Sequence, residues 1–453
     1  MNTNKRTLIA VILLITAFVA LLNQTLMITA LPVMAETLHV SLNVAQWLTA
    51  GYVLTIGLVT PISANLIDKF TSRQLFLGVV ALFIVGTIIG PLTTNFAIIL
   101  LGRLLQAVAG GILTTFVMVS MISLYPPEKP GLVMGYVSLV ISAGPAIGPT
   151  LSGLIMNQFP WQALFYFILP IMTLAWLAGW FWLPNYTEKQ TTRIDGQSVA
   201  SVVVGIGLMM SSITIFAQNV WIATAMLVIG LLVTVFFIRR QFTLETPLLD
   251  LNLFKQSSFS MMIVSLMLTF AILMGTEALI PVYVENVLHQ SSLIAGLVML
   301  PGAFANAIAA PIVGRFYDQH GVKWPLLSGA GLLIISSLPF FWMTAHTSLW
   351  WLGLVYVVRM IGVSMILSTT TTESLSDLPA RSIGYGTALN NTLRQISGSA
   401  ANTLLIMASL IPAQLIVGFR LSMGFIFIGV LLLTVIIVIY VAKYGRKVDG
   451  SRN

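Results

Sequence analysis

Long apolar blocks, separated by short polar or Pro/Gly-rich breaks, recur along the whole chain. Each block has about 20 residues, the length that a helix needs to cross roughly 30 Å of hydrocarbon at about 1.5 Å per residue. The pattern therefore predicts an all-α integral membrane protein. The predicted membrane-spanning helices are 8–30, 44–67, 75–92, 96–123, 131–156, 161–183, 198–217, 220–239, 260–284, 292–313, 325–343, 349–372, 384–409 and 420–443.

Composition supports this reading. Of the 453 residues, 58% are hydrophobic and 8% are charged, and the mean hydropathy is +0.98, whereas soluble domains carry roughly 25% charged residues. The net charge of +8 does not indicate nucleic-acid binding, because the basic residues form no dense run. The chain has no cysteine, and its four histidines lie in predicted loops without the spacing of a zinc site. We therefore expect no metal, no cofactor and no nucleic-acid partner.

The first apolar block follows Lys5 and Arg6, as in a secretory signal peptide. Its apolar run exceeds the about 7 to 15 residues of a signal sequence, so we interpret it as a retained first helix. An even number of spans with a cytoplasmic N-terminus puts nearly all lysines and arginines in inside loops. The exceptions are Arg420, outside, and three arginines within helices. This bias predicts a multi-pass protein of the bacterial cytoplasmic membrane with both termini in the cytoplasm.

An internal repeat relates the two halves of the chain. Asp68 and Asp318 are 250 residues apart, as are Arg73 and Lys323. If 198–217 and 220–239 are an insertion, the segments 64–73 and 314–323 each follow the second helix of a six-helix set. Two similar bundles are the usual architecture for alternating access. The predicted organisation is an N-terminal six-helix bundle at 1–183, a linker with the inserted pair and an interfacial segment at 184–258, a C-terminal six-helix bundle at 259–443 and a cytoplasmic tail at 444–453.

Six motifs occur in order along the chain. They are Leu22-Asn23-Gln24-Thr25 with Leu31-Pro32, the loop 64–73, Gly102-Arg103-Leu104-Leu105-Gln106 with Gly110, Gly144-Pro145-Ala146-Ile147-Gly148-Pro149 with Gly153, Trp161–Phe165 with Pro170, and Pro247–Phe254.

This series resembles the fourteen-helix drug:proton antiporter family of the major facilitator superfamily, over essentially the whole chain. The resemblance implies a major facilitator fold of two six-helix bundles plus two inserted helices, and multidrug efflux driven by the proton gradient. The implied partners are protons, small molecules and the bilayer.

The loop 64–73 combines an acid at a helix end with following bases. Asp68, Lys69 and Arg73 suit a cytoplasmic latch that breaks during transport, and Asp318 and Lys323 occupy the matching places in the second half. The alternative is that these charges only mark the cytoplasmic side.

Arg103 lies within the predicted span 96–123, on one helix face with Gln106, Gly110 and Thr114. A buried arginine costs several kcal/mol unless it is paired or hydrated, so a function is the default interpretation. The family resemblance implies proton coupling, and a purely structural arginine bonded to carbonyl groups is the alternative.

Glycines and prolines interrupt the span 131–156. Gly144, Pro145, Gly148 and Pro149 predict a kinked, closely packed helix, because small residues allow close approach and proline removes a helix hydrogen bond. Together with Gly153 they match the family's antiporter motif, and this match favours export over uptake.

The span 384–409 carries Asn391, Arg394, Gln395 and Asn402. Such a polar stripe either lines a cavity or joins helices by hydrogen bonds. The residues expected to line the substrate cavity are Asn23, Gln24, Gln106, Glu277, Asn391, Arg394 and Gln395.

The chain departs from the family in its first span, where Asn23 replaces the usual acid. Glu277 is the acid placed well inside an apolar span, in the repeat counterpart of the first helix. Apolar surroundings disfavour an ionised carboxyl group, which makes proton capture possible near neutral pH. We therefore predict that Glu277, with Arg103 and Asp68, takes part in proton coupling. A protonated glutamate that only stabilises packing is the alternative.

These expectations combine into proton-coupled export of small amphipathic or lipophilic compounds. A proton symporter or a facilitator on the same fold is the first rival. An integral-membrane enzyme is the second, but the chain has no interfacial cluster of His, Asp and Glu, no phosphate loop and no catalytic-triad spacing. We expect no enzymatic activity.

Overall fold

The computed structural model describes residues 3–125, 130–186, 195–215, 219–245, 247–379 and 382–450. Across these ranges the regular structure is entirely helical, and each predicted span overlaps a long helix. Residues 187–194 of the predicted linker and 451–453 of the predicted tail lie outside the described ranges.

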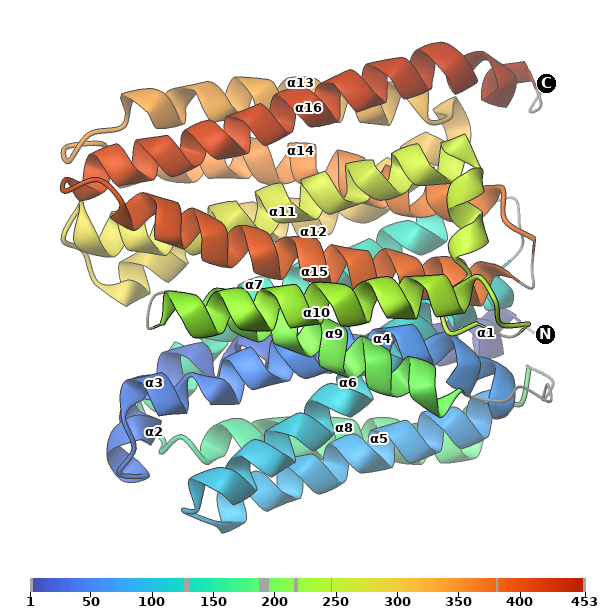
Figure 1. The fold of residues 1–453 in the computed structure, drawn as a ribbon, viewed down its shortest axis with the longest axis horizontal. Helices are drawn as coiled ribbons and strands as arrows, with labels where there is room; N and C mark the ends of the chain where they lie inside the picture. The colour runs from blue at the N-terminus through green and yellow to red at the C-terminus, as the bar shows by residue number, and fades with distance from the viewer. Residues whose placement is uncertain are drawn as a thin grey trace. The chain divides into compact units, whose positions relative to one another are not determined.

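The chain divides into two compact units. The first contains Met1–Leu124, Ala143–Leu251 and Ala380–Thr392. Its short elements are η1 (Ile28–Ala30), α2 (Leu31–Thr37), α3 (Leu42–Ala45) and η2 (Gly90–Leu92). Its long helices, traced in Figure 1, are α1 (Thr3–Leu26), α4 (Trp47–Lys69), α5 (Ser72–Ile89), α6 (Phe96–Leu124), α8 (Ala163–Trp182), α9 (Gly196–Ile215) and α10 (Val220–Gln241).

The second unit contains Tyr125–Ser142, Asn252–Pro379 and Leu393–Asn453. Its short elements are η4 (Leu338–Trp342) and most of η3 (Leu251–Lys255). Its long helices are α11 (Ser257–Asn286), α12 (Ser292–His320), α13 (Lys323–Ser337), α14 (Leu349–Ser376) and α16 (Leu415–Gly450).

Two helices contribute to both units. The division falls inside α7 (Pro130–Met156) and inside α15 (Ile383–Leu410). The chain bends by 42° between Pro145 and Thr150, so α7 consists of two straight segments. This bend lies at the Gly-Pro motif that predicted a kink.

Helix ends follow from local side chains. Thr71 accepts a hydrogen bond from the backbone N–H of Gln74 at the start of α5, and Ser291 accepts one from Ile294 at the start of α12. Such caps satisfy amides that have no partner inside the helix. At the other end of α12, Gly321 has a φ of 74°, a conformation that glycine adopts without strain.

Glycines allow close contacts between helix backbones in the first unit. A Cβ atom at Gly86 of α5 would lie 2.5 Å from the carbonyl oxygen of Gly102 in α6, and one at Gly230 of α10 would lie 2.9 Å from that of Gly205 in α9. Asp195, just before α9, joins the end of α10 through a 2.7 Å ion pair with Arg240. The hydrogen bond from Arg240 holds the pKa of the Asp195 carboxyl well below its usual range.

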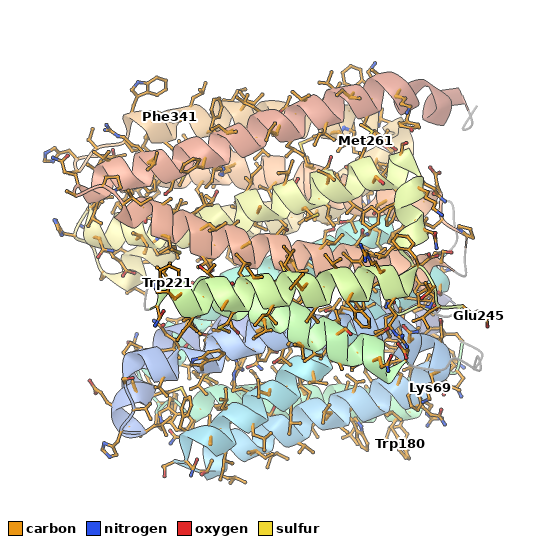
Figure 2. All side chains as sticks on the ribbon, viewed as in Figure 1. Lys69, Trp180, Trp221, Glu245, Met261 and Phe341 are labelled. Atoms are coloured by element: carbon orange, nitrogen blue, oxygen red, sulfur yellow. The ribbon has the colours of Figure 1, made fainter. Side chains whose placement is uncertain are left out.

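Large apolar side chains cover the outside of the helices. Trp221, which Figure 2 shows at one end of α10, is 85% exposed, and Trp350 at the start of α14 is 91% exposed. In water such exposure would be unfavourable, but it suits contact with lipid. The molecule is therefore a multi-pass membrane protein.

By length and hydropathy, 11 described helices can cross a membrane, or 12 with the bent α7. Two predicted spans do not meet this criterion. The apolar part of α9 is short, at Gly196–Met209, and α15 carries several polar side chains. The total of fourteen spans stays a prediction.

Candidate functional site

A fully buried arginine forms the centre of a polar network in the first unit. Arg103 of α6 donates from Nη1 to Asn23 Oδ1 at 2.9 Å and to Gln106 Oε1 at 3.0 Å. Its Nη2 donates to the backbone oxygen of Asn23 at 3.0 Å, and its Nε to that of Leu48 at 3.2 Å. The guanidinium also lies 4.2 Å from the centre of the Tyr52 ring. Neutral acceptors and an aromatic face therefore stabilise this charge.

The network continues from Arg103 to a third helix. Asn23 Nδ2 donates to Gln106 Oε1 at 3.0 Å, and Gln106 Nε2 donates to Thr87 Oγ1 of α5 at 2.8 Å. Asn23, Arg103 and Gln106 are each 0% exposed. The structure thus brings together three predicted site residues. Gln24, the neighbour of Asn23, is half-buried and does not contribute to the hydrogen bonds of this network.

A second buried arginine occupies the matching place in the second unit. Arg359 of α14 donates from Nε to Thr276 Oγ1 and from Nη1 to Ser337 Oγ, both at 2.9 Å. Its third nitrogen, Nη2, is buried without a hydrogen-bond partner in the described part of the chain. Since an unsatisfied buried donor costs about 1–3 kcal/mol, this Nη2 is available for an acceptor.

The carboxyl group of Glu277 lies on α11, directly after Thr276. The side chain is half-buried and is close enough to Tyr356 of α14 to act on it electrostatically. Across the described residues, no hydrogen bond or ion pair to this carboxyl is found. Tyr356 lies one helical turn before Arg359, so α11 and α14 place an acid, a phenol and a guanidinium in one region. Such an acid can take up and release a proton without breaking a bond to the protein.

The predicted polar stripe on α15 is divided between the units. Asn391, in the first, donates to Thr115 Oγ1 of α6 at 3.1 Å. Arg394, in the second, is buried with its guanidinium 5.1 Å from the centre of the Phe270 ring. Its Nε has no hydrogen-bond partner among the residues that the structure describes. Gln395 is half-buried, and Asn402 is exposed, so the stripe does not continue as a buried face to position 402.

The first predicted latch does not show the expected pairing. Asp68 is half-buried at the end of α4, with no ion pair among the described residues. It acts electrostatically on Tyr385 of α15. Lys69, labelled in Figure 2, is exposed, and Arg73 donates to the backbone oxygen of Trp180 and stacks on its ring.

The matching acid in the second unit does hold another helix. Asp318 Oδ1 accepts a hydrogen bond from the backbone N–H of Gly131 at 2.8 Å, and Oδ2 accepts one from Leu132 at 2.9 Å. Both amides belong to the first turn of α7, where a negative charge is favoured by the helix dipole. Lys323 is exposed and stacks on Trp324.

Two of the three glycines of the predicted antiporter motif, Gly144 and Gly148, lie against α1 in the first unit. A Cβ atom at Gly144 would lie 2.9 Å from Leu21 Cβ, and one at Gly148 would lie 2.1 Å from Thr25 Oγ1. Thr25 Oγ1 donates to the backbone oxygen of Pro145 at 2.9 Å. Gly153 faces open space, and the side chain of Pro149 lies outside the described part. Four of the five motif residues are thus placed, and three of them contact α1.

One acid is missing from the residues that the sequence suggested. Glu373 is 4% exposed near the end of α14, where it accepts hydrogen bonds from Tyr317 and Tyr440. Its place at the predicted end of a span made it resemble an ordinary helix-end acid. The preceding run of serine and threonine, 368–372, is buried throughout and was the available signal.

Comparison with known proteins adds the family. The model of the Major Facilitator Superfamily matches residues 13–402. The "Lincomycin resistance protein LmrB" of Listeria innocua is 33% identical over 87% of this chain and 84% of its own length. The "Multidrug export protein EmrB" of Haemophilus influenzae is 25% identical over 88% of this chain and 79% of its own. The structure of the human organic anion transporter MFSD10 has a TM-score of 0.72 at 14% identity, covering 96% of this chain and 100% of that one, which shows the shared fold.

Proposed function

The chain belongs to the major facilitator superfamily, and from this premise we propose that it is a proton-driven antiporter that exports small amphipathic or lipophilic compounds. Drugs, dyes and biocides are the expected substrates, and alternating access is the expected mechanism. The printed names of relatives similar over most of the chain, a lincomycin resistance protein and a multidrug export protein, support export.

The single observation that carries proton coupling is the carboxyl group of Glu277. It lies inside a 30-residue apolar helix without a hydrogen-bond or ion-pair partner among the described residues. A group in this position changes its charge when it binds a proton, and ionisable groups within membrane spans are expensive and seldom idle. Asn23 cannot substitute for it, since an amide carries no titratable proton.

We propose the following cycle. In the outward-open state, a proton enters and neutralises Glu277, and a cationic substrate loses its charge attraction and leaves. After the transporter opens inward, Glu277 releases the proton to the cytoplasm and can attract the next substrate. The driving force is about 2.3 kcal/mol per charge and 100 mV.

Arg103 has a separate role in this proposal. Because four hydrogen bonds to α1, α4 and α6 hold its guanidinium, the arginine fixes these helices around a permanent positive charge. A fixed cation discourages a second cation from resting in the same region.

The test is an everted-vesicle assay with cationic, zwitterionic and neutral compounds, recording proton and substrate movement together. We expect uphill substrate movement into the vesicles that needs a proton gradient and dissipates it. A symporter or a facilitator is the second candidate. The Glu277 site is compatible with it, because a proton-binding group alone does not determine the direction of transport. A symporter would move protons and substrate in the same direction, and a facilitator would never concentrate substrate.

A further inference from the structure

A second buried acid lies in the second unit, separate from Glu277. Oε1 of Glu373 accepts a hydrogen bond from the hydroxyl of Tyr440 of α16 at 2.7 Å, and Oε2 accepts one from the hydroxyl of Tyr317 of α12. The Tyr440 hydroxyl also shares a 3.1 Å hydrogen bond with Ser258 Oγ of α11. Both tyrosines are 1% exposed. One carboxyl group on α14 thus connects three further helices.

Glu373, Tyr317, Tyr440 and Ser258 form a hydrogen-bonded cluster. Its hydrogen bonds depend on the charge of the Glu373 carboxyl group. An ionised carboxylate accepts two hydroxyl donors, and such charge-assisted bonds are short and strong. A protonated carboxyl group needs an acceptor for its own hydrogen, so one of the two tyrosine hydroxyls must turn or move. Binding of one proton at Glu373 therefore changes how α12 and α16 are held.

The change at α12 reaches the first turn of α7 directly. Tyr317 precedes Asp318, whose two carboxylate oxygens accept the backbone N–H groups of Gly131 and Leu132. The two helices touch here without side chains between them, because a Cβ atom at Gly131 would lie 2.4 Å from the carbonyl oxygen of Gly314. A small displacement of the end of α12 therefore alters the hold of Asp318 on α7.

The cluster is too far from Glu277 to share its proton. Ser258 and Glu277 are 19 residues apart on α11, which corresponds to about 28 Å along the helix axis. In the predicted topology, the ends of α12, α14 and α16 and the start of α11 all lie on the cytoplasmic side.

Resting on the proposed function, we propose that Glu373 is a second proton-binding group, which exchanges protons with the cytoplasm and controls, through Tyr317, how firmly Asp318 holds α7. The ionised group keeps α7 held, and protonation releases it. Glu373 then responds to the proton concentration of the cytoplasm, the side to which the transporter must open to bind substrate.

Within the described ranges, titratable groups next to the cluster lie on α12, α14 and α16, where Tyr444 packs against Tyr440. Asp377, at the end of α14, acts electrostatically on Tyr440, and Asp318 follows Tyr317 on α12. The nearby group on α11 is Ser258, which does not titrate, and Lys323 at the start of α13 stacks on Trp324. We assign the proton to Glu373 because it is the buried acid that receives both phenol donors.

Hydrogen–deuterium exchange tests the proposal without relying on transport. The purified protein in lipid nanodiscs is exchanged between about pH 5.5 and about pH 8.5, with rates corrected for intrinsic exchange, and the peptide covering 131–136 is followed. We expect at least about a tenfold loss of protection on acidification of the wild type. Glu373→Gln should remove the pH dependence, and Tyr317→Phe should weaken it while leaving the carboxyl in place.

Two controls define the outcome. Asp318→Asn should lower protection at every pH, which shows that the peptide reports the hold on α7, and Ser258→Ala should keep the wild-type pH profile. Protection of the wild type that does not change with pH, or a wild-type profile in Glu373→Gln or Tyr317→Phe, overturns the proposal. Glu277→Gln should leave the exchange profile unchanged, so a failure of export in the vesicle assay would reject the proposed function and not this site.

Discussion

At the scale of single residues, the two buried arginines differ in how completely they are satisfied. Every guanidinium nitrogen of Arg103 donates to an acceptor, whereas Nη2 of Arg359 finds no acceptor within the described ranges. The complete set of hydrogen bonds at Arg103 suits a fixed structural charge that positions α1 and α6. The incomplete set at Arg359, in the helix that packs against Glu277, suits a charge whose hydrogen-bond partner changes during transport.

We predict that Arg103→Ala abolishes transport, because it removes the four hydrogen bonds of the guanidinium and takes the arginine donor away from Asn23 Oδ1, at a cost of about 1–3 kcal/mol. Arg103→Lys should recover only part of the activity, since lysine lacks the planar fork of donors. Initial export rates, normalised to protein in the membrane, measure this. Arg420→Ala, which removes a guanidinium from the predicted outer side, is the control and should transport normally. If neither Arg103 variant inserts or folds, the arginine is purely structural.

The site could be predicted from the sequence only in part. Arg103 and Gln106 were identified by their helical spacing, and Asn23 by its place in a motif, and the structure joins the three. No local pattern indicates the contacts with Thr87 and Leu48, because these depend on which helices are neighbours. Glu373 was missed for a different reason: hydropathy ended its helix one residue earlier, and a buried end cannot be told from an exposed one by composition.

At the scale of elements, the contact of α7 with α1 depends on glycine. We predict that Gly148→Ala lowers thermal stability and transport, because the added Cβ would lie 2.1 Å from Thr25 Oγ1, and such overpacking costs about 1–3 kcal/mol. Gly153→Ala on the same helix is the matched control, since its Cβ would contact nothing within 4 Å. Thermal unfolding temperatures of both purified variants test this prediction. Equal temperatures would contradict it, because they would show that α7 and α1 can separate at no cost in stability.

The elements themselves were largely predictable. Apolar blocks of membrane length are a strong signal, so each predicted span overlaps a long helix. Hydropathy could not predict that α7 and α15 would each be divided between two units. That division depends on contacts between distant segments, such as Asp318 with the start of α7, which no local pattern encodes.

At the scale of the whole molecule, the fourteen-span topology makes a direct prediction for α9 and α10. The natural chain has no cysteine, so single cysteines can be introduced without removing others. Asn219→Cys, between the two helices, should react with an impermeant thiol reagent added outside intact cells. Thr243→Cys, after α10, should react only when the membrane is opened. The reverse pattern, or equal reaction of both, would contradict an inserted spanning pair.

The predicted latches should govern movement rather than binding. We predict that Asp318→Asn lowers the turnover of transport severalfold and leaves substrate affinity within about twofold, because the charge at the start of α7 is worth about 0.3–1 kcal/mol. Asp68→Asn should also lower the turnover of transport more than the substrate affinity. Binding titrations and transport rates on the same preparations separate the two effects. A change in affinity that matches the loss of turnover would place these acids in the substrate site.

Replacement of one carboxyl group tests the central claim of proton-driven export most directly. Glu277→Gln keeps size and hydrogen bonding but removes the titratable group, and Glu285→Gln, eight residues further along α11, is the matched control. In proteoliposomes with an imposed proton gradient, we measure uphill substrate export and proton movement together. The account predicts that Glu277→Gln loses both while downhill exchange of a neutral substrate survives, and that Glu285→Gln retains both. Uphill export by Glu277→Gln at the wild-type rate, with proton movement intact, would contradict it.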